Sequence, residues 1–315
     1  MPETILSVDR LSKSYGNVQA VKEISFKISK GEIFSLLGPN GAGKTTTLAM
    51  LCCLLKPTSG EAFLGGYSIL RQSFHVRKMI GVIPQDLALY YPLTARQNLY
   101  FWGRLQGLDR KQLQTRSAEV LDQVALSDRA NDRVETFSGG MQRRLNVAIG
   151  LLHQPAFLLM DEPTVGIDPQ SRRGILDLVK ELRSQGVTIL YTTHYMEEAA
   201  EISDRVGIMD HGELIALGTH QELVQLVGHQ ELLRLHFPEE LNLDPLASSL
   251  RILPGVLSVA SSQEQLVLAV PDAASILPGV VSVLQKMHIS LKAIEIEEPS
   301  LEAVFLHLTG RGLRN

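Results

Sequence analysis

Three short, nearly unbroken apolar runs stand out in the first two thirds of the 315-residue chain: IFSLL from residue 33, AFLLM from residue 156 and VTILY from residue 187. Runs of this length and composition are typical of strands that are buried on both faces. Small, polar or charged residues follow each run. We therefore predict an α/β fold whose buried strands end at a common edge, where ligands of such sheets collect.

Other segments carry helical signals. Thr94 and Gln97 have the spacing of a capping box, which predicts a helix start within a mostly helical stretch at about residues 86–150. Thr219 and Glu222 have the same spacing, and Gly228 is placed to end that helix. Residues 1–228 are expected to form one domain.

The pattern changes in residues 229–315, which we expect to form a small α+β domain. ELLRLHF predicts a strand, LDPLASSLRIL a helix, VLSVASSQEQLVLAV a hairpin and ISLKAIEIEE a further strand after a helix that ends near Met287. This is a ferredoxin-like order. ILPGVLSV at residue 252 and ILPGVVSV at residue 276 are nearly identical, but their contexts predict a strand start in the first and a helix start in the second. A last amphipathic helix should begin at Pro299 or Ser300 and end at Gly310.

Composition narrows the possible functions. Hydrophobic residues make up 44% and charged residues 20%, as in a globular protein, and the formal net charge of −4 argues against a nucleic-acid partner. No apolar run approaches the roughly 18 residues of a membrane span, and the N-terminus does not resemble a signal peptide. Any role at a membrane would therefore need a partner. The adjacent Cys52 and Cys53 are expected in the core, unpaired, which fits a reducing cytoplasm.

The strongest chemical signal follows the first apolar run. Four residues separate Gly38 from Gly43, and Lys44 and Thr45 come directly after Gly43. The glycines let a loop curl so that its N–H groups point at phosphate oxygens, and the next helix adds its positive N-terminal end. Lys44 would neutralise the outer phosphates, and the Thr45 hydroxyl is placed to ligate Mg²⁺. This spacing predicts a site for a nucleoside triphosphate.

Candidate catalytic groups follow the second and third runs. Asp161 and Glu162 come directly after AFLLM, where Asp161 could hold the Mg²⁺ shell through water and Glu162 could polarise the attacking water. Successive residues leaving a strand point opposite ways, so the two carboxylates need not share a task. His194 follows the third run, and we predict that it contacts the γ-phosphate.

A second glycine motif lies in ETFSGGMQRRL at residues 135–145. Ser138 can cap the helix that follows, Gly139 and Gly140 permit close backbone approach, and the helix dipole favours an anion. The residues alone leave open which phosphate would bind here.

Together these motifs resemble the ATP-binding cassette of ABC transporters. The resemblance extends to about residue 220 and rests on LSKSYG, GPNGAGKTT, IGVIPQD, FSGGMQ, FLLMDEP, GID and TTH. It implies a P-loop NTPase cassette with a mixed-sheet core, an antiparallel β subdomain and a helical subdomain, with ATPase activity and with ATP and Mg²⁺ as cofactors.

The resemblance also implies roles for single residues. Tyr15 would stack on adenine, Gln85 would sense the γ-phosphate, and Asp168 would communicate between paired cassettes. The catalytic group would be Glu162, His194 and Gln85, and the Mg²⁺ group Thr45, Gln85 and Asp161. The nucleotide would be held by Tyr15, Gly38, Pro39, Asn40, Gly41, Ala42, Gly43, Lys44, Thr45 and Thr46.

In this family two cassettes pair head to tail. The signature motif of one, matched here by FSGGMQ, caps the γ-phosphate bound by the other. Ser138, Gly139 and Gly140 would therefore act on the ATP of a second chain, in a homodimer or in a heterodimer with a similar cassette. Two positions depart from the family pattern. Phe137 replaces Leu and keeps an apolar anchor, whereas Met141 replaces a hydrogen-bonding Gln and has no predicted role.

A separate transmembrane permease subunit is the other partner that the resemblance implies. In the family the segment after Gln85 receives a short helix of that subunit, and this chain gathers aromatic residues there: Tyr90, Tyr91, Tyr100, Phe101 and Trp102. EPSLEAVFLHLTGR resembles the C-termini of ATPases that serve drug-resistance and nodulation-type exporters. We therefore predict the ATP-hydrolysing cytoplasmic subunit of an exporter, peripheral on the inner face of the cell membrane, for a drug, lipid or oligosaccharide-type substrate.

The alternative is a soluble cassette ATPase that acts on DNA or ribosomes. DNA-repair relatives carry long coiled-coil insertions between the phosphate loop and the signature, but only about 90 residues lie there in this chain. Translation-factor relatives carry two cassettes per chain, whereas this chain has one. A P-loop kinase or GTPase would leave the signature and Tyr15 unexplained, so the exporter is favoured. The sequence does not specify the exported substrate.

Overall fold

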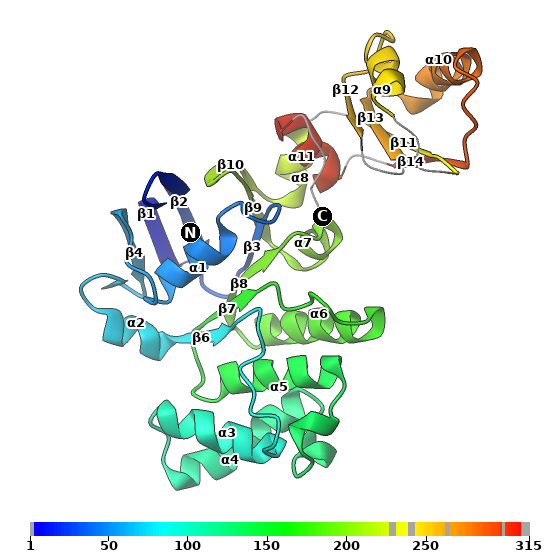
Figure 1. Cartoon of the computed structure of the whole chain (residues 1–315). Helices are drawn as coiled ribbons and strands as arrows, with labels where there is room; N and C mark the ends of the chain where they lie inside the picture. Colours follow the sequence, from blue (N-terminus) through cyan, green and yellow to red (C-terminus); the bar gives the residue numbers. More distant parts are fainter. Residues whose placement is uncertain (1–2, 227–230, 239–242, 262–264, 298–299, 310–315) are drawn as a thin grey trace. The chain divides into compact units, whose positions relative to one another are not determined.

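The three apolar runs form the centre of a six-stranded sheet in the computed structural model, which describes residues 3–226, 231–238, 243–261, 265–297 and 300–309 (Figure 1). Every residue of β3 (Ile33–Leu37), β7 (Phe157–Asp161) and β8 (Thr188–Thr193) is buried, as expected for strands covered on both faces. The strand order is β10-β9-β3-β8-β7-β6, completed by β6 (Ile80–Ile83), β9 (Arg205–Asp210) and β10 (Glu213–Gly218).

The strand register brings the ends of the central strands together. β3 pairs in parallel with β8 and β9, and β7 pairs in parallel with β6 and β8. Leu37 lies opposite Thr193, and Asp161 lies opposite Thr192. Only two residues join β9 to β10, so that pair runs antiparallel and the sheet is mixed, as predicted.

A second, antiparallel sheet has the order β2-β1-β4-β5. Its strands are β1 (Thr4–Tyr15), β2 (Val18–Ser29), β4 (Ser59–Leu64) and β5 (Tyr67–Ser68). Buried side chains of this sheet share one apolar core with β3 and α1 (Lys44–Leu51), which includes stacked rings of Phe26 and Phe34.

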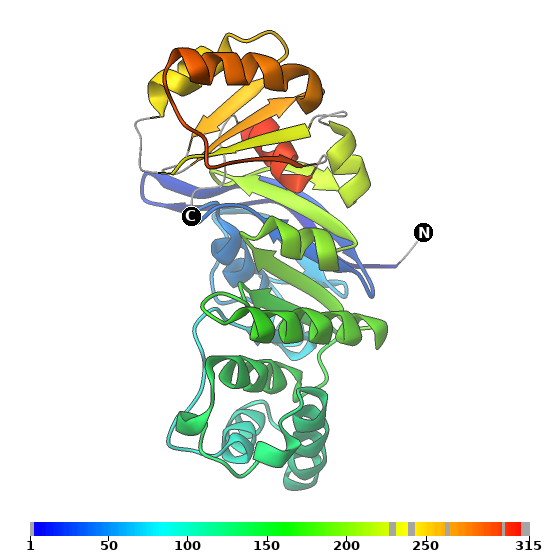
Figure 2. The same ribbon diagram turned by 90° about the vertical axis from the view of Figure 1, so that its right-hand side faces the viewer.

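Helices make up the rest of this part of the chain. A helical group of α3 (Ala95–Leu105), α4 (Arg110–Gln123) and α5 (Gly139–Leu151) packs together, with α5 also against α6 (Pro169–Ser184) (Figures 1 and 2). The predicted capping box of Thr94 and Gln97 is present at the start of α3. The remaining elements are α2 (Ser73–Met79), α7 (Met196–Ile202) and the short 3₁₀ turns at Ser127–Arg129 and Val134–Thr136.

The C-terminal part has the predicted ferredoxin-like strand order. The elements run β11 (Glu231–His236), α9 (Asp244–Arg251), β12 (Ser258–Ser261), β13 (Gln265–Val270), α10 (Ala273–Lys286) and β14 (Ala293–Glu297). The sheet order is β12-β13-β11-β14, with antiparallel pairing throughout. Helices α8 (His220–Leu226) and α11 (Leu301–Thr309) contact each other, and α11 also contacts β12 and β13.

The chain divides into two units, Met1–Leu37 with Gly41–Leu214, and Ile215–Asn315 with Gly38–Asn40. The predicted boundary at residue 228 and the predicted helix stop at Gly228 lie outside the described residues. So do Pro299 and Gly310, the predicted limits of the last helix, and residues 262–264 of the predicted hairpin. Thr219 and Glu222 exchange both hydrogen bonds of their predicted capping box.

One predicted helix start is wrong. The first ILPG segment precedes β12, as expected, but the second lies inside α10, which begins at Ala273 rather than at Ile276. The Asp272 side chain accepts hydrogen bonds from the N–H groups of Ala274 and Ser275, so this cap sets the start. Pro278 therefore lies in the helix interior.

Candidate functional site

The loop after β3 owes its path to glycine. Gly43 has φ 102°, in the left-handed region, and a Cβ there would lie 2.5 Å from the Ala20 carbonyl oxygen. A side chain would therefore meet both backbone strain and a clash. The conformation starts α1 at Lys44, so the first N–H groups of that helix follow the loop directly. Residues 38–46 thus combine a glycine-rich loop with a helix N-terminus, the arrangement that suits phosphate.

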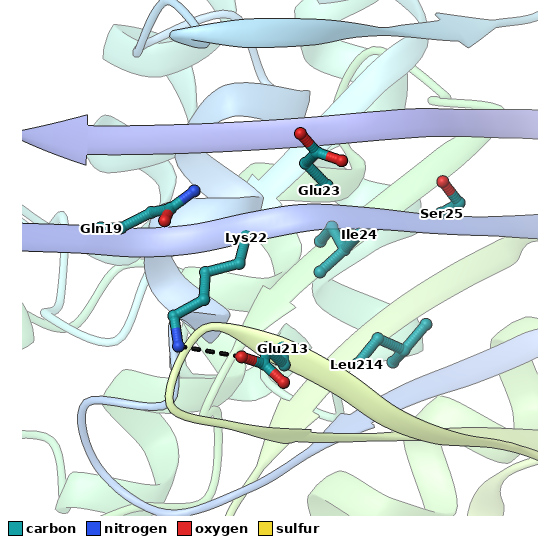
Figure 3. Close-up of a pocket in the computed structure, with 7 residues that line it drawn as sticks. All are labelled: Gln19, Lys22, Glu23, Ile24, Ser25, Glu213 and Leu214. Carbon is teal, nitrogen blue, oxygen red and sulfur yellow. Dashed lines mark hydrogen bonds and ion pairs between the residues drawn. The ribbon is translucent and has the colours of Figure 1, made fainter.

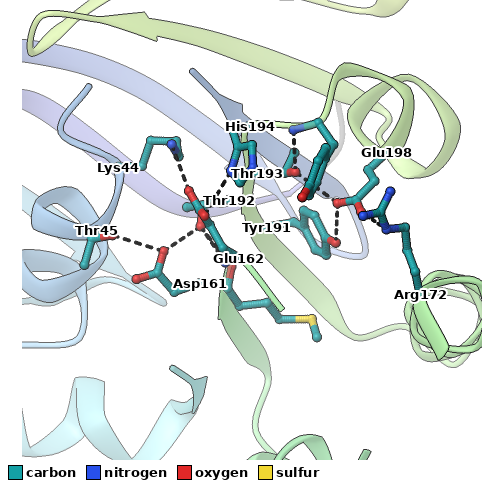
Figure 4. Close-up of polar contacts among 12 residues, drawn as sticks. Lys44, Thr45, Asp161, Glu162, Arg172, Tyr191, Thr192, Thr193, His194 and Glu198 are labelled. Carbon is teal, nitrogen blue, oxygen red and sulfur yellow. Dashed lines mark hydrogen bonds and ion pairs between the residues drawn. The ribbon is translucent and has the colours of Figure 1, made fainter. Parts of the chain in front are cut away.

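A buried row of charged groups crosses the strand ends next to this loop (Figure 4). Lys44 Nζ lies 3.0 Å from Glu162 Oε1, and the two side chains are only 4% and 6% exposed. Glu162 Oε2 lies 3.0 Å from Nδ1 of His194. An ionised carboxylate only accepts hydrogen bonds, so this contact assigns the ring hydrogen to Nδ1. Glu162 therefore contacts the predicted phosphate lysine and the predicted γ-phosphate histidine at once.

Asp161 has a different set of partners. Its Oδ1 accepts a 2.6 Å hydrogen bond from the Thr192 hydroxyl and a 3.3 Å hydrogen bond from the Thr45 hydroxyl. The two adjacent carboxylates thus face different neighbours, as the alternation of a strand implies. Asp161 is placed beside the hydroxyl at the start of α1, and Glu162 beside the ammonium of Lys44.

The backbone at Glu162 is unusual. Its φ is 43°, in the left-handed region that a non-glycine residue seldom adopts. Its N–H donates to the carbonyl and to the hydroxyl of Thr192, at 3.2 and 3.0 Å, and these bonds hold the turn that ends β7. Strained conformations of this kind concentrate at functional sites.

Several other predicted site residues are exposed and lie on separate elements. Tyr15 ends β1 and is 51% exposed, with Lys13 Nζ 5.3 Å from its ring centroid. Gln85 lies just after β6 and is exposed. Its backbone carbonyl accepts a hydrogen bond from the Arg143 guanidinium. Asp168 caps α6 by accepting from the Ser171 N–H. The Ser171 hydroxyl, and after it this backbone bond, holds the pKa of Asp168 below its usual range.

The signature residues start α5. Ser138 caps the helix by accepting from the Met141 N–H at 3.3 Å, and Gly139 is exposed beside it. Gly140 is buried, and a Cβ there would lie 1.9 Å from Ser171 Oγ. Met141 packs against the large apolar core and lines a cavity of about 550 Å³ between α5 and α6. Ser138 and Gly139 are open to solvent, whereas Gly140 and Met141 face the protein.

A set of polar residues next to the strand ends is not among the predicted site residues. Thr192, Tyr191, Arg172 and Glu198 all take part in hydrogen bonds or ion pairs next to the predicted site (Figure 4). Thr192 had a signal, since it precedes His194 at a strand end. Glu198 had none, because a glutamate in MEEAAEI has the appearance of a solvated helix face.

A second hollow lies away from these residues. It measures about 460 Å³ and is lined mainly by β2 and the start of β10, with the ion pair of Lys22 and Glu213 at 2.9 Å on its wall (Figure 3). None of the predicted site residues lines it. The Cys52 side chain is buried and Cys53 half-buried, and burial raises the pKa of Cys52 to about 11, as befits an inert core thiol.

Known proteins resemble this chain over most of its length. A family model described as ABC transporter matches residues 21–165. The linearmycin resistance ATP-binding protein LnrL of Bacillus subtilis is 44% identical over 313 residues, covering 99% of this chain and 100% of that protein. The Nod factor export ATP-binding protein I of Paraburkholderia xenovorans is 38% identical and covers 100% of both chains. The doxorubicin resistance ATP-binding protein DrrA of Mycobacterium tuberculosis is 38% identical, with coverage of 96% and 92%.

Solved structures show the same cassette fold. The structure of cbiO1 from Clostridium perfringens, described as part of the ABC transporter complex cbiONQ, aligns with a TM-score of 0.64 at 27% identity, covering 71% of this chain and 94% of that chain. An ATP-binding cassette described as a dimer in a post-hydrolysis state, bound to ADP and Pi, aligns with a TM-score of 0.62 at 28% identity, covering 68% and 98%.

Proposed function

The chain belongs to the ATP-binding proteins of ABC transporters, and from this membership and the site geometry we propose that it drives an exporter by hydrolysing ATP in the Lys44–Glu162 site. The observation that carries the proposal is the buried contact of Lys44 with Glu162, beside Thr45 and Asp161. These groups come from two chain segments, one after β3 and one at the end of β7, and meet at the carboxyl edge of the sheet.

Mg²⁺ suits the oxygen atoms beside α1. Hard cations of this kind take oxygen ligands, and Mg²⁺ is held by few protein groups together with waters and substrate phosphates. The Thr45 hydroxyl and the Asp161 carboxylate are 3.3 Å apart and meet that need. Thr45 would bind the ion directly and Asp161 through water, and Gln85 would complete the set. The ion neutralises charge on the transferred phosphoryl group.

The residues of this chain would share the hydrolysis step. Lys44 and the N–H groups of residues 38–46, apart from Pro39, hold the phosphates, and Tyr15 stacks on the adenine. Glu162 accepts a proton from the water whose oxygen attacks the γ-phosphorus, while the bond to the ADP oxygen breaks. His194, oriented through Nδ1 by Glu162, contacts the γ-phosphate. Lys44 and His194 both contact Glu162, which supports this division of roles.

A second chain would complete the site. The exposed Ser138 and Gly139 at the start of α5 can approach an anion on another molecule, and Asp168 lies exposed at the start of α6. The dimeric relative bound to ADP and Pi supports this arrangement. We propose a head-to-tail pair of cassettes, formed with a second copy or with a similar chain.

A membrane subunit would carry the substrate. None of the described helices is long and apolar enough to cross a membrane. The relatives are named for resistance to linearmycin or doxorubicin and for Nod factor export, which supports an exporter over a DNA or ribosome ATPase. We propose a drug, lipid or oligosaccharide-type substrate, with the chain held at the inner face of the cell membrane by its permease.

The test of this function is Glu162→Gln in the full-length chain. We expect ATP binding to persist while hydrolysis falls at least about 100-fold, since general-base catalysis contributes 10²–10⁴-fold. The variant should accumulate as an ATP-bound dimer. Turnover is measured by phosphate release, and dimerisation by size-exclusion chromatography with ATP.

Glu197→Gln is the matched control, because Glu197 is an exposed glutamate near the same strand ends. It should keep turnover at the level of the unaltered chain. Undiminished hydrolysis by Glu162→Gln would remove Glu162 from the catalytic role.

A further inference from the structure

Besides Asp161 and Glu162, a third carboxylate, that of Glu198, is buried near His194 (Figure 4). The Glu198 side chain, on α7, is only 3% exposed. Its Oε2 accepts hydrogen bonds from the Tyr191 hydroxyl and the Thr193 hydroxyl, each at 2.9 Å. Its Oε1 lies 3.5 Å from Nε of Arg172 on α6. One carboxylate thus joins strand β8 to helix α6.

These contacts hold both neighbours of His194. The Thr193 hydroxyl that donates to Glu198 also accepts from the Tyr195 N–H at 2.9 Å. The ring centroids of Tyr195 and His194 lie 4.2 Å apart. The Arg172 guanidinium lies 4.3 Å from the centroid of the Tyr195 ring. The residues before and after His194 are therefore both fixed, and its ring packs against one of them.

The same arginine lies in the first turn of α6. The backbone N–H of Arg172 donates to the Asp168 carbonyl at 2.9 Å. The Asp168 side chain accepts from the N–H of Ser171, the residue before Arg172. Ser171 packs against Gly140 of the signature helix. Consecutive residues of α6 thus contact two functional segments: Ser171 meets the signature, and Arg172 meets the support of His194.

Stability alone is a poor reason for this arrangement. Burying a carboxylate costs free energy that one ion pair need not recover, so such groups are weak sources of stability. The neighbouring Glu201 shows how α6 and α7 can be tied more simply. It pairs with Arg173 and Lys180 at 2.6 Å each, with a third of its side chain exposed. Glu198 instead accepts hydrogen bonds from two hydroxyls beside His194, and its other oxygen pairs with Arg172 at 3.5 Å without a hydrogen bond.

We propose that Glu198 and Arg172 are positioning residues for His194. They hold the turn after β8 against the first turn of α6, so that the imidazole keeps its place between Glu162 and the γ-phosphate. The inference rests on the proposed function, since it needs His194 to act in hydrolysis. In the proposed arrangement neither residue contacts the nucleotide. Both act through Thr193 and Tyr195.

The test compares Glu198→Gln with the control Glu201→Gln in the full-length chain. Gln keeps a similar volume but loses the charge that attracts Arg172. We expect kcat of Glu198→Gln to fall at least about tenfold, because a small misplacement of a reacting group has effects of this size. KM for ATP should stay within about twofold, and Glu201→Gln should match the unaltered chain in both constants.

A second comparison separates positioning from a general loss of structure. Glu198→Gln is made again in a His194→Ala background, where it should lower kcat no further, since its effect is transmitted through the absent imidazole. A purely structural role would lower kcat by the same factor in both backgrounds. That additive result, or a Glu198→Gln enzyme with unchanged kcat, overturns the inference.

Arg172→Gln is a second variant that tests the same inference if Glu198→Gln does not fold. The Arg172 side chain is partly exposed, so its loss leaves no new buried cavity of its size. It should show the same drop in kcat and the same dependence on His194, and an additive effect overturns the inference equally. Failure of the function itself is distinguishable, because Glu162→Gln would then keep its turnover.

Discussion

Two adjacent glycines of the signature meet different physical demands. A Cβ at Gly139 would have no heavy atom within 4 Å, whereas a Cβ at Gly140 would lie 1.9 Å from Oγ and 2.5 Å from Cβ of Ser171. The first position is therefore free for close approach by another molecule. The second is fixed by the packing of α5 on α6, and the same Ser171 is held by the Asp168 cap.

Alanine substitutions separate these demands. Gly140→Ala should force α5 and α6 apart and cost about 1–3 kcal/mol of unfolding free energy, as overpacking of a tight contact does. Gly139→Ala should leave the free energy of unfolding nearly unchanged but still slow hydrolysis, if its N–H approaches the partner's phosphate. Denaturant unfolding and phosphate release on both variants check this. Equal stability of the two variants would contradict the packing argument.

Exposed aromatic residues at α3 form a candidate docking surface in the helical group. Helix α3 and the preceding loop gather three exposed aromatic side chains, Tyr90, Tyr91 and Phe101. The rings of Tyr90 and Phe101 lie 4.6 Å apart, and the Trp102 indole donates to the Ala88 carbonyl at 2.9 Å. The indole bond and the ring contacts give this surface a fixed shape, and exposed aromatics of this kind are what interfaces concentrate.

Tyr91→Ala tests the proposed contact with the permease. Its backbone carbonyl is hydrogen-bonded to Glu135 N–H, so alanine preserves that bond and removes only the exposed ring. We expect weaker co-purification with the membrane subunit and less coupled transport, while ATP hydrolysis by the isolated chain stays unchanged. Phe63→Ala, which removes a similarly exposed aromatic from β4, serves as the control. Unchanged co-purification and transport would exclude Tyr91 from the contact.

At the scale of the whole molecule, the proposed functional unit is two chains. The phosphate loop starts α1 and the signature starts α5, and each exposes groups suited to an anion. The cassette structure described as a dimer bound to ADP and Pi supports pairing across chains. One chain would then hold each nucleotide, and the other would complete its surroundings.

Ser138→Arg tests this division of labour. The long cation at the exposed start of α5 should block approach to the partner's nucleotide and abolish hydrolysis. ATP binding by the monomer should stay largely intact, because Lys44 and its neighbours are unchanged. Binding is measured with a fluorescent ATP analogue and turnover by phosphate release. Loss of ATP binding by the isolated monomer would contradict the cross-chain arrangement.

Local patterns in the sequence were sufficient for much of the fold. The buried strands β3, β7 and β8, the capping box at Thr94 and the strand order of the C-terminal part all follow from hydrophobic period and turn signals within short windows. The start of α10 did not follow, because the helix start was assigned to the segment at Ile276, whereas the aspartate that caps the helix is Asp272, four residues earlier. Capping by Asp272 satisfies free N–H groups at the helix start, and this decided the boundary.

Spacing and the preceding strands are enough to predict which residues carry the chemistry: the Gly-Lys-Thr loop, the two carboxylates and the histidine. Their partners come from the folded chain: Glu162 between Lys44 and His194, Gly140 against Ser171, and Glu198 hydrogen-bonded to the hydroxyl of Thr193, which precedes His194. The physical reason is distance along the chain. Spacing reports on neighbours within a few residues, whereas a contact such as Lys44 with Glu162 exists only after the parallel strands have aligned their ends.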